Sequence, residues 1–155
     1  MSHFKIIQLD RDPVTEDNVM TEEDVNEDAL LLMSSDGWEP DDEPDAFQNV
    51  KSRLSKIGKV LIRKKTFTFT EKETLLKNYT ESMESVFRNW RSKIESKQFT
   101  MGEFQLRTDV REACGVDDLF YYDGYLHNAS GLIADFLAGY VPEKMHIGAI
   151  FDCHR

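Results

Sequence analysis

Two cysteines and four histidines are the side chains of this sequence best suited to nucleophilic or metal chemistry. Cys114 with His127 or His146 could form a pair in which the imidazole accepts the thiol proton and the thiolate attacks. The run Asp-Cys-His at residues 152–154 offers oxygen, sulfur and nitrogen ligands to a metal ion. Neither group has the spacing of a known nucleophile signature or zinc site. The sequence therefore predicts no cofactor and no metal site, and a small enzyme that uses Cys114 or the histidines is the third of three functional hypotheses.

The charge of the chain is unevenly distributed. Residues 10–45 contain fifteen Asp or Glu and one basic residue, Arg11, whereas residues 51–97 contain thirteen Lys or Arg and five Glu. The formal net charge of −10 is therefore the sum of a strongly acidic segment and a basic region. Such fields steer encounters with charged partners, but they imply no particular reaction.

The leading hypothesis is that the acidic segment binds a basic surface on a partner protein. Carboxylates spaced along a surface can imitate a phosphate backbone and compete for the Lys and Arg of nucleic-acid-binding proteins. Apolar residues such as Val19, Met20 and Val25 recur among the acids, which a purely solubilising arm would not need. We interpret the protein as a non-enzymatic inhibitor, immunity protein or accessory regulator. The candidate partner-binding residues are Asp36, Trp38, Glu39, Asp41, Asp42, Glu43 and Asp45.

The alternative hypothesis is a nucleic-acid-binding protein that uses the basic region 51–97 and has the acidic segment as its autoinhibitor. Phe67 and Phe69 lie two residues apart on an expected strand, where they could stack on bases beside the cations. Phenylalanines in a strand more often belong to the core. The candidate nucleic-acid contacts are Lys51, Arg53, Lys56, Arg63, Lys64 and Lys65.

A length of 155 residues predicts a single domain, with an acidic, partly ordered segment at residues 10–45 and a folded body at residues 46–155. Ten Phe and five Tyr are enough for an apolar core. No basic and apolar leader follows Met1, and the chain has only two cysteines, so we expect a cytoplasmic protein. The longest uncharged run, residues 124–134, is too short to cross a bilayer.

Periodicity and turn residues predict the elements of the fold. Strands are expected at residues 4–9, 59–69, 119–126 (interrupted by Asp123-Gly124) and 146–151. Helices are expected after the caps Thr21, Asp45, Thr70, Thr100 and Asn128, with the last four ending near Gly58, Lys97, Gly115 and Gly139. Residues 29–33 fit either a helix or a strand, and residues 36–45 are typical of a loop. The predicted fold class is α+β: one long central amphipathic helix packed on a small antiparallel sheet.

Overall fold

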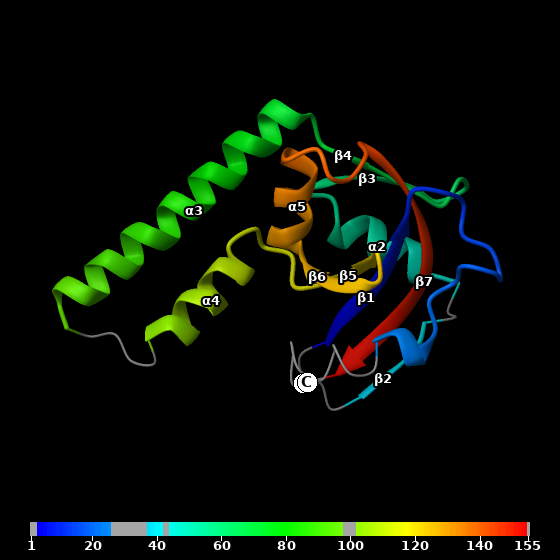
Figure 1. The fold of residues 1–155 in the computed structure, drawn as a ribbon, viewed down its shortest axis with the longest axis horizontal. Helices are drawn as coiled ribbons and strands as arrows, with labels where there is room; N and C mark the ends of the chain where they lie inside the picture. The colour runs from blue at the N-terminus through cyan, green and yellow to red at the C-terminus, as the bar shows by residue number, and fades with distance from the viewer. Residues whose placement is uncertain (1–2, 26–36, 42–43, 98–101, 155) are drawn as a thin grey trace.

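A computed structural model gives the fold and describes residues 3–25, 37–41, 44–97 and 102–154 (Figure 1). It is an α+β fold, as predicted, and residues 22–25 are helical. In this part of the chain no helix is long and apolar enough to span a membrane. The remaining elements are β1 (His3–Asp10), β2 (Gly37–Pro40), α2 (Ala46–Arg53), β3 (Gly58–Leu61), β4 (Thr66–Phe69), α3 (Lys72–Glu95), α4 (Gly102–Glu112), β5 (Leu119–Tyr122), β6 (Tyr125–Asn128), α5 (Ala129–Leu137) and β7 (Lys144–His154).

The seven described strands form one mixed sheet. Its order is β3-β4-β7-β1-β5-β6, and β2 pairs with the end of β7. β1 runs antiparallel along one edge of β7, while β4 and β2 share the other edge. β1 and β5 are parallel, so the expectation of an antiparallel sheet is wrong. Parallel pairing needs a long crossover between the two strands, and here most of the chain lies between them.

The expected strand at residues 59–69 is a hairpin. β3 and β4 pair antiparallel from Gly58 opposite Phe69 to Leu61 opposite Thr66. Lys65 in the connecting turn has a φ of 49°, a left-handed conformation that glycine or asparagine usually adopts. The connection Ile-Arg-Lys-Lys contains no glycine, proline or asparagine, which is why no turn could be predicted there.

The β5–β6 hairpin and the helix after it agree with the sequence prediction. Asp123 and Gly124 have φ values of 53° and 84°, as the type I′ turn favoured by an Asp-Gly pair requires. Asn128 then caps α5, because its side chain accepts a hydrogen bond of 2.8 Å from the Gly131 amide. Such a cap stabilises a helix by about 1 kcal/mol.

The two faces of the sheet carry two separate cores. The larger core packs α2, α5 and the start of α3 on one face, and it includes the fully buried Ile7, Phe67 and Phe120. The opposite face is covered from the N-terminal segment by Met20 and Val25, which are 3% and 0% exposed. Met20 and Val25, two of the apolar residues between the acids, therefore cover this face of the sheet.

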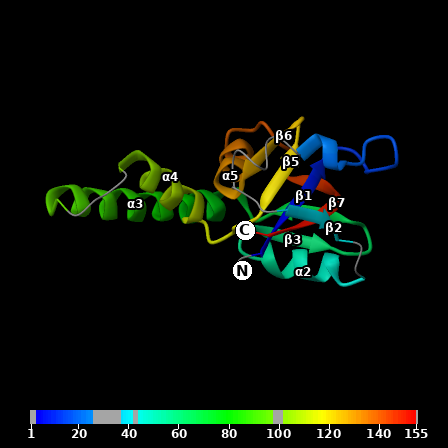
Figure 2. The same ribbon diagram turned by 90° about the horizontal axis from the view of Figure 1, so that it is seen from below.

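The long helix is an arm and not a central helix. α3 and α4 lie side by side and project away from the sheet, as Figure 1 and Figure 2 show. Only Leu75 and Val86 of α3 are buried. The length and period of the helix were predicted correctly. The expected packing was wrong, because an apolar stripe indicates a face suited to burial without identifying what covers it.

Local hydrogen bonding at the helix starts differs from the expected capping boxes. Asp45 precedes α2 and Glu71 precedes α3, and neither side chain makes a capping hydrogen bond. At Thr21, by contrast, the Asp24 carboxylate accepts from the Thr21 amide at 2.7 Å and from its hydroxyl at 3.0 Å. The first of these is one of the two hydrogen bonds of a capping box, in which the side chain of the third helical residue accepts from the backbone amide of the N-cap residue.

Residues 37–40, which were expected in a loop, form β2. They pair antiparallel with residues 151–154 of β7. A four-residue strand with glycine and proline at its ends has too little periodicity to be recognised, and proline restricts it to a sheet edge. The pairing with β7 is what makes this segment a strand.

Replacing Phe136 with alanine should lower the free energy of unfolding by about 3–5 kcal/mol. Phe136 is 7% exposed, and its ring stacks on Phe69 with centroids 4.2 Å apart. Tyr140 is the matched control, because it is 70% exposed and lies four residues further on. Tyr140→Ala should change stability by about 0.5 kcal/mol or less. Urea denaturation measures the free energy of unfolding of both variants. An equal loss of stability in the two would contradict this description of the core.

Candidate functional site

The strands that pair with β7 leave a gap along one edge. β4 pairs with residues 144–146 and β2 with residues 151–154, so no described strand lies beside residues 147–150 on that edge. A groove of about 760 Å³ opens at this gap. This volume is in the range of ligand-binding clefts. The groove is lined by residues Val14, Thr15, Glu16, Val19, Met20, Thr21, Glu22, Pro40, Asp41, Ala46, Phe47, Lys65, Ile147, Gly148, Ala149, Ile150 and Phe151.

The buried side chain of Gln8 holds one wall of the groove against β7. Its Oε1 accepts hydrogen bonds from the amides of Met20 (2.8 Å) and Ala149 (3.1 Å). Its Nε2 donates to the Asn18 carbonyl at 2.7 Å. Gln8 is only 3% exposed, and these bonds satisfy both ends of its amide. One side chain thus joins the segment that precedes Met20 to the strand edge in the groove.

Gly148 makes room for this amide. A Cβ at Gly148 would lie 2.3 Å from Oε1 of Gln8 and 2.8 Å from the side chain of Val14. Both distances are shorter than a side chain tolerates, so any larger residue would push the wall away from β7. The glycine at this position of β7 therefore has a steric reason.

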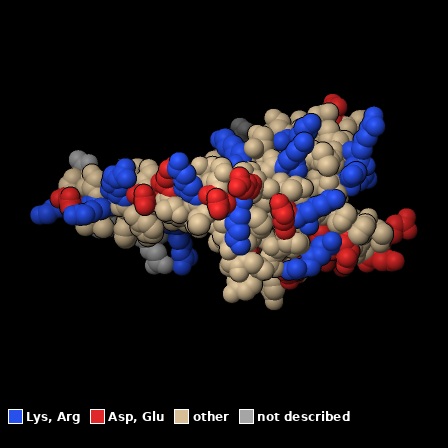
Figure 3. Space-filling model, turned by 90° about the horizontal axis from the view of Figure 1, so that it is seen from above, with Lys and Arg blue, Asp and Glu red and all other residues tan. Residues whose placement is uncertain are grey.

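Exposed carboxylates are part of the lining of the groove. Glu16 and Glu22 line it and are exposed, and Lys65 lines it with its Nζ 5.4 Å from the centre of the Phe47 ring. In Figure 3 acidic side chains gather at the lower right of the body, whereas basic ones gather along its upper side. The groove therefore combines apolar walls with a field that attracts cations. Other exposed acids of the same segment are Asp12, Asp17, Glu23 and Asp24.

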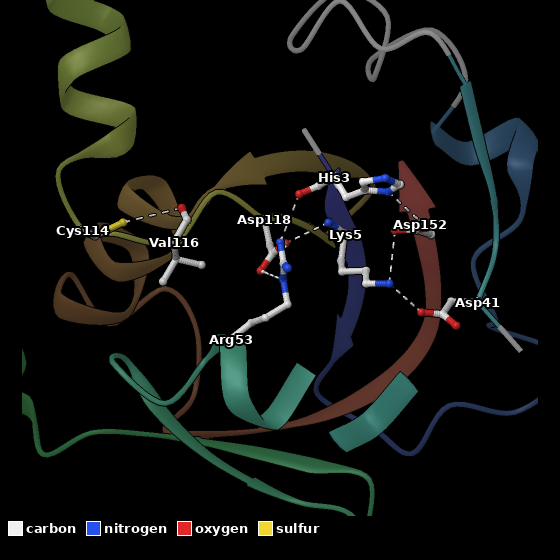
Figure 4. A network of polar contacts seen from close by, with 8 residues as sticks. All are labelled: His3, Lys5, Asp41, Arg53, Cys114, Val116, Asp118 and Asp152. Atoms are coloured by element: carbon white, nitrogen blue, oxygen red, sulfur yellow. Dashed lines mark hydrogen bonds and ion pairs between the residues drawn. The ribbon is translucent and has the colours of Figure 1, made fainter. Parts of the chain in front are cut away.

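Asp41 lies in an internal ion-pair network and not on the open surface. Its carboxylate is 2.7 Å from Nζ of Lys5, which is also 3.1 Å from Asp152 (Figure 4). The side chains of Lys5 and Asp41 are 12% and 6% exposed. Burial alone would lower the pKa of Lys5, but its hydrogen bonds to Asp41 and Asp152 outweigh burial and raise the pKa above its usual value.

A second network joins α2 to the start of β5. The Asp118 side chain is 2% exposed and accepts three hydrogen bonds of 2.7–3.0 Å from the guanidinium of Arg53 (Figure 4). It also accepts one of 2.8 Å from the Lys5 amide. The hydrogen bonds to Asp118 raise the pKa of Arg53. Arg53 is therefore used to compensate a buried carboxylate.

The structure separates the predicted partner-binding residues. Asp36, Asp42 and Glu43 lie outside the described residues, and Trp38 and Glu39 are placed by their backbone in β2. Asp41 lines the groove with its carboxylate paired to Lys5, and Asp45 is exposed just before α2. The groove acids Glu16 and Glu22 were not predicted. No local pattern reveals that their segment folds over the sheet.

The predicted nucleic-acid contacts are mostly exposed, with Arg53 as the exception because of its pair with Asp118. Phe67 and Phe69 are 0% and 3% exposed, so they belong to the core and cannot stack on bases. Among the described residues, no ion pair joins the acids of residues 10–45 to the basic region, so the expected autoinhibitory contact is not observed there. The exposed predicted contacts are Lys51, Lys56, Arg63, Lys64 and Lys65.

Cys114 and His127, which were considered as a catalytic pair, each contact other side chains. Cys114 lies 4.0 Å from the Ser130 hydroxyl, and His127 stacks on Tyr122 with ring centroids 3.8 Å apart. Burial, above all, raises the pKa of Cys153 to about 12, which keeps its thiol protonated. Within the ranges that the structure describes, no group of three or more His, Cys, Asp or Glu is placed to hold a metal ion.

Comparisons with known proteins assign no family. No protein-family profile, no curated protein and no solved structure matches this chain. The groove and the charged surfaces around it are therefore the features of the molecule that bear on its function.

Replacing Gln8 with glutamate should make the stability depend on pH. A carboxylate would face the Asn18 carbonyl, whereas the protonated acid could donate to it and still accept from Met20 and Ala149. The folded-state pKa of this carboxyl should therefore exceed the unfolded value of about 4.3. By linkage, the variant should approach wild-type stability below about pH 4 and lose stability as the pH rises through the folded pKa. Urea denaturation from acidic to neutral pH checks this, and a pH-independent deficit would contradict it.

Lys5→Met should remove stability that the wild-type protein itself loses in alkali. The pKa of Lys5 is raised above 10.5, so its contribution is complete below the unfolded pKa and disappears as the pH rises through the folded pKa. Lys5→Met should cost about 1–3 kcal/mol at neutral pH, because two carboxylates lose their partner. The deficit should shrink at higher pH in denaturant melts. Lys59→Met is the matched control at neutral pH, because Lys59 is exposed and its loss should cost about 0.5 kcal/mol or less.

Proposed function

We propose that this protein binds a partner protein through the groove beside β7, and that it receives there an apolar side chain flanked by Lys or Arg. This is a non-enzymatic function, and inhibition, immunity and accessory regulation all use it. The proposal is carried by one observation: a groove of about 760 Å³ is lined by apolar residues and by the exposed Glu16 and Glu22.

The apolar walls and the carboxylates would have different roles in binding. Burial of apolar surface on Val14 and Val19, which are half-buried and exposed, supplies affinity. The carboxylates attract a basic segment from a distance and disfavour an acidic one, which affects the association rate and the choice of partner. A partner with an exposed apolar residue among cations satisfies both conditions.

The proposed groove adjoins the acidic residues that the sequence singled out. Pro40 and Asp41 line it, and the exposed Asp45 immediately precedes Ala46, which also lines it. The carboxylate of Asp41 compensates Lys5, so its part in binding would be to hold the groove in shape. Among the described carboxylates, Glu16, Glu22 and Asp45 are the ones that would attract the basic segment of the partner.

Two pairs of charge-neutralising substitutions test the proposal. Glu16→Gln with Glu22→Gln removes two charges that line the groove, and Asp17→Asn with Glu23→Gln removes two exposed charges of the same segment that do not. Exposed charges contribute little to stability, so both variants should fold. The probe is an immobilised array of peptides that each present one apolar residue between Lys or Arg. Association should slow roughly three- to tenfold for the groove variant, with a flatter salt dependence, and less than about twofold for the control.

Equal slowing in the two variants would mean that overall charge attracts the peptides, and the groove would lose its assigned role. Failure of the wild-type protein to bind any basic and apolar peptide would contradict the proposed partner chemistry. Peptides that bind in this assay also give the sequence pattern with which to identify the partner recovered by affinity purification.

The second candidate function is nucleic-acid binding on the opposite side of the body, where Figure 3 shows the cations gathered. Lys51 and Lys59 line a groove of about 390 Å³ between α2 and β3, together with Ser52 and Ser55. Retention of a labelled oligonucleotide on a filter at about 50 mM salt would favour it, since such binding weakens steeply as salt rises. Lys51→Gln with Lys59→Gln should then lose retention, and absence of retention by the wild-type protein removes this candidate.

A further inference from the structure

The projecting arm carries a regular apolar stripe on its exposed side. Leu76, Phe87 and Ile94 are 51%, 54% and 42% exposed, although each is a large apolar residue on the same helix. Steps that alternate between four and three residues are the spacing of a coiled-coil seam. The stripe consists of the exposed Leu76, Phe87 and Ile94, the half-buried Met83 and Trp90, and the polar, exposed Thr80.

The two borders of the stripe are different. On one side Val86 is buried and Lys93 lies 3.9 Å from Asp109 of α4, so this side faces the second helix of the arm. On the other side a row of charges borders the stripe. Its members are the exposed Lys77, Glu84 and Arg91.

We propose that a second copy of this chain binds the stripe, with the two α3 helices packed antiparallel. The steps of four, three, four, three and four residues are the same when the helix is read in reverse, so the stripe is complementary to itself in this orientation. A twofold axis between two identical surfaces is also the commonest symmetry of protein homodimers. The inference stands apart from the proposed function, because the groove and the arm share no residue.

The charged row excludes full overlap of the two stripes. With Leu76 opposite Ile94, the same antiparallel register would bring Glu84 of the two copies together and Lys77 next to Arg91. Both pairs within this row would then join like charges, which disfavours the assembly.

A shift of the two helices by one heptad toward the tip of the arm replaces these like-charge pairs with opposite-charge pairs. Met83 then lies opposite Ile94 and Phe87 opposite Trp90, while Glu84 lies opposite Arg91 at both symmetry-related positions. Arg91 pairs with Glu95 in the single chain at 3.0 Å, but both side chains are largely exposed and can exchange partners at little cost. Charge complementarity therefore selects the register in which residues 83–94 overlap.

This register is compatible with the shape of the molecule. The tip of the arm is the part furthest from the sheet in Figure 1, so overlap at the tip places the two bodies at opposite ends. The grooves beside β7 remain open in both copies. A dimer of this kind would present two grooves to one partner surface and would gain avidity without new contacts.

Sedimentation velocity of the full chain tests the proposal. The mass should rise from 18.0 kDa toward twice that value as the concentration increases from about 1 to 200 μM, because assembly follows mass action. Phe87→Glu should hold the chain at 18.0 kDa throughout. Leu76→Glu is the matched control, since Leu76 is as exposed as Phe87 and lies on the same stripe outside the overlap. Circular dichroism verifies that both variants keep the helices.

A charge exchange tests the register independently. Glu84→Arg alone should weaken association at least about threefold, because it brings like charges together. Glu84→Arg combined with Arg91→Glu restores an opposite-charge pair and should recover wild-type association.

Three results would overturn the inference. A wild-type chain that stays at 18.0 kDa over the whole range would show that no second copy binds the arm. Association that survives Phe87→Glu would place the interface elsewhere. Loss of association in Leu76→Glu as complete as in Phe87→Glu would exclude the shifted register.

Discussion

Strand β7 and its bulge are the constraint on which the other elements depend. β1 pairs along one edge of β7, with Ile7 opposite Ile150 and Leu9 opposite Ile147, so β7 has one residue more than β1 between these pairs. Without that extra residue, side chains three apart would point to opposite faces. Because of it, Ile147 and Ile150 both reach the larger core. Gln8 lies opposite the bulge and accepts the hydrogen bond of the Ala149 amide.

The groove opens beside the same bulge. β4 begins at Thr66, directly after the β3–β4 turn, so its pairing with β7 stops at residue 146, and β2 pairs with β7 only at residues 151–154. Gln8 then holds Met20 over the opening, and Met20 in turn belongs to the core on the second face of the sheet. The wall of the groove is therefore tied to the sheet by the hydrogen bonds of Gln8. A site on such a wall loses little conformational entropy when a partner binds.

Sequence reasoning succeeded where the structure is determined locally. Asp123-Gly124 and Asn128 each act within a few residues, and they correctly predicted the break between β5 and β6 and the start of α5. Sequence reasoning failed where the position of a side chain depends on residues far away in the chain. Lys5 lies 36 positions before Asp41 and buries a carboxylate that was expected on the surface. The position of the groove acids likewise depends on Gln8, and a lone glutamine in a strand gives no signal of its role.

The charge asymmetry of the sequence persists in the folded protein because the buried ion pairs consume little of it. The Lys5–Asp41 pair neutralises one carboxylate of the acidic segment, because Lys5 lies outside the basic region. The Arg53–Asp118 pair neutralises one cation of the basic region, because Asp118 lies outside the acidic segment. The other described acids of residues 12–24 stay exposed on one side and the lysines around β3 on another. Charges separated by more than about 8 Å are largely screened from one another at physiological salt. Each surface can therefore attract its own partner without being neutralised by the other, and a segment bound in the acidic groove would leave the basic side free.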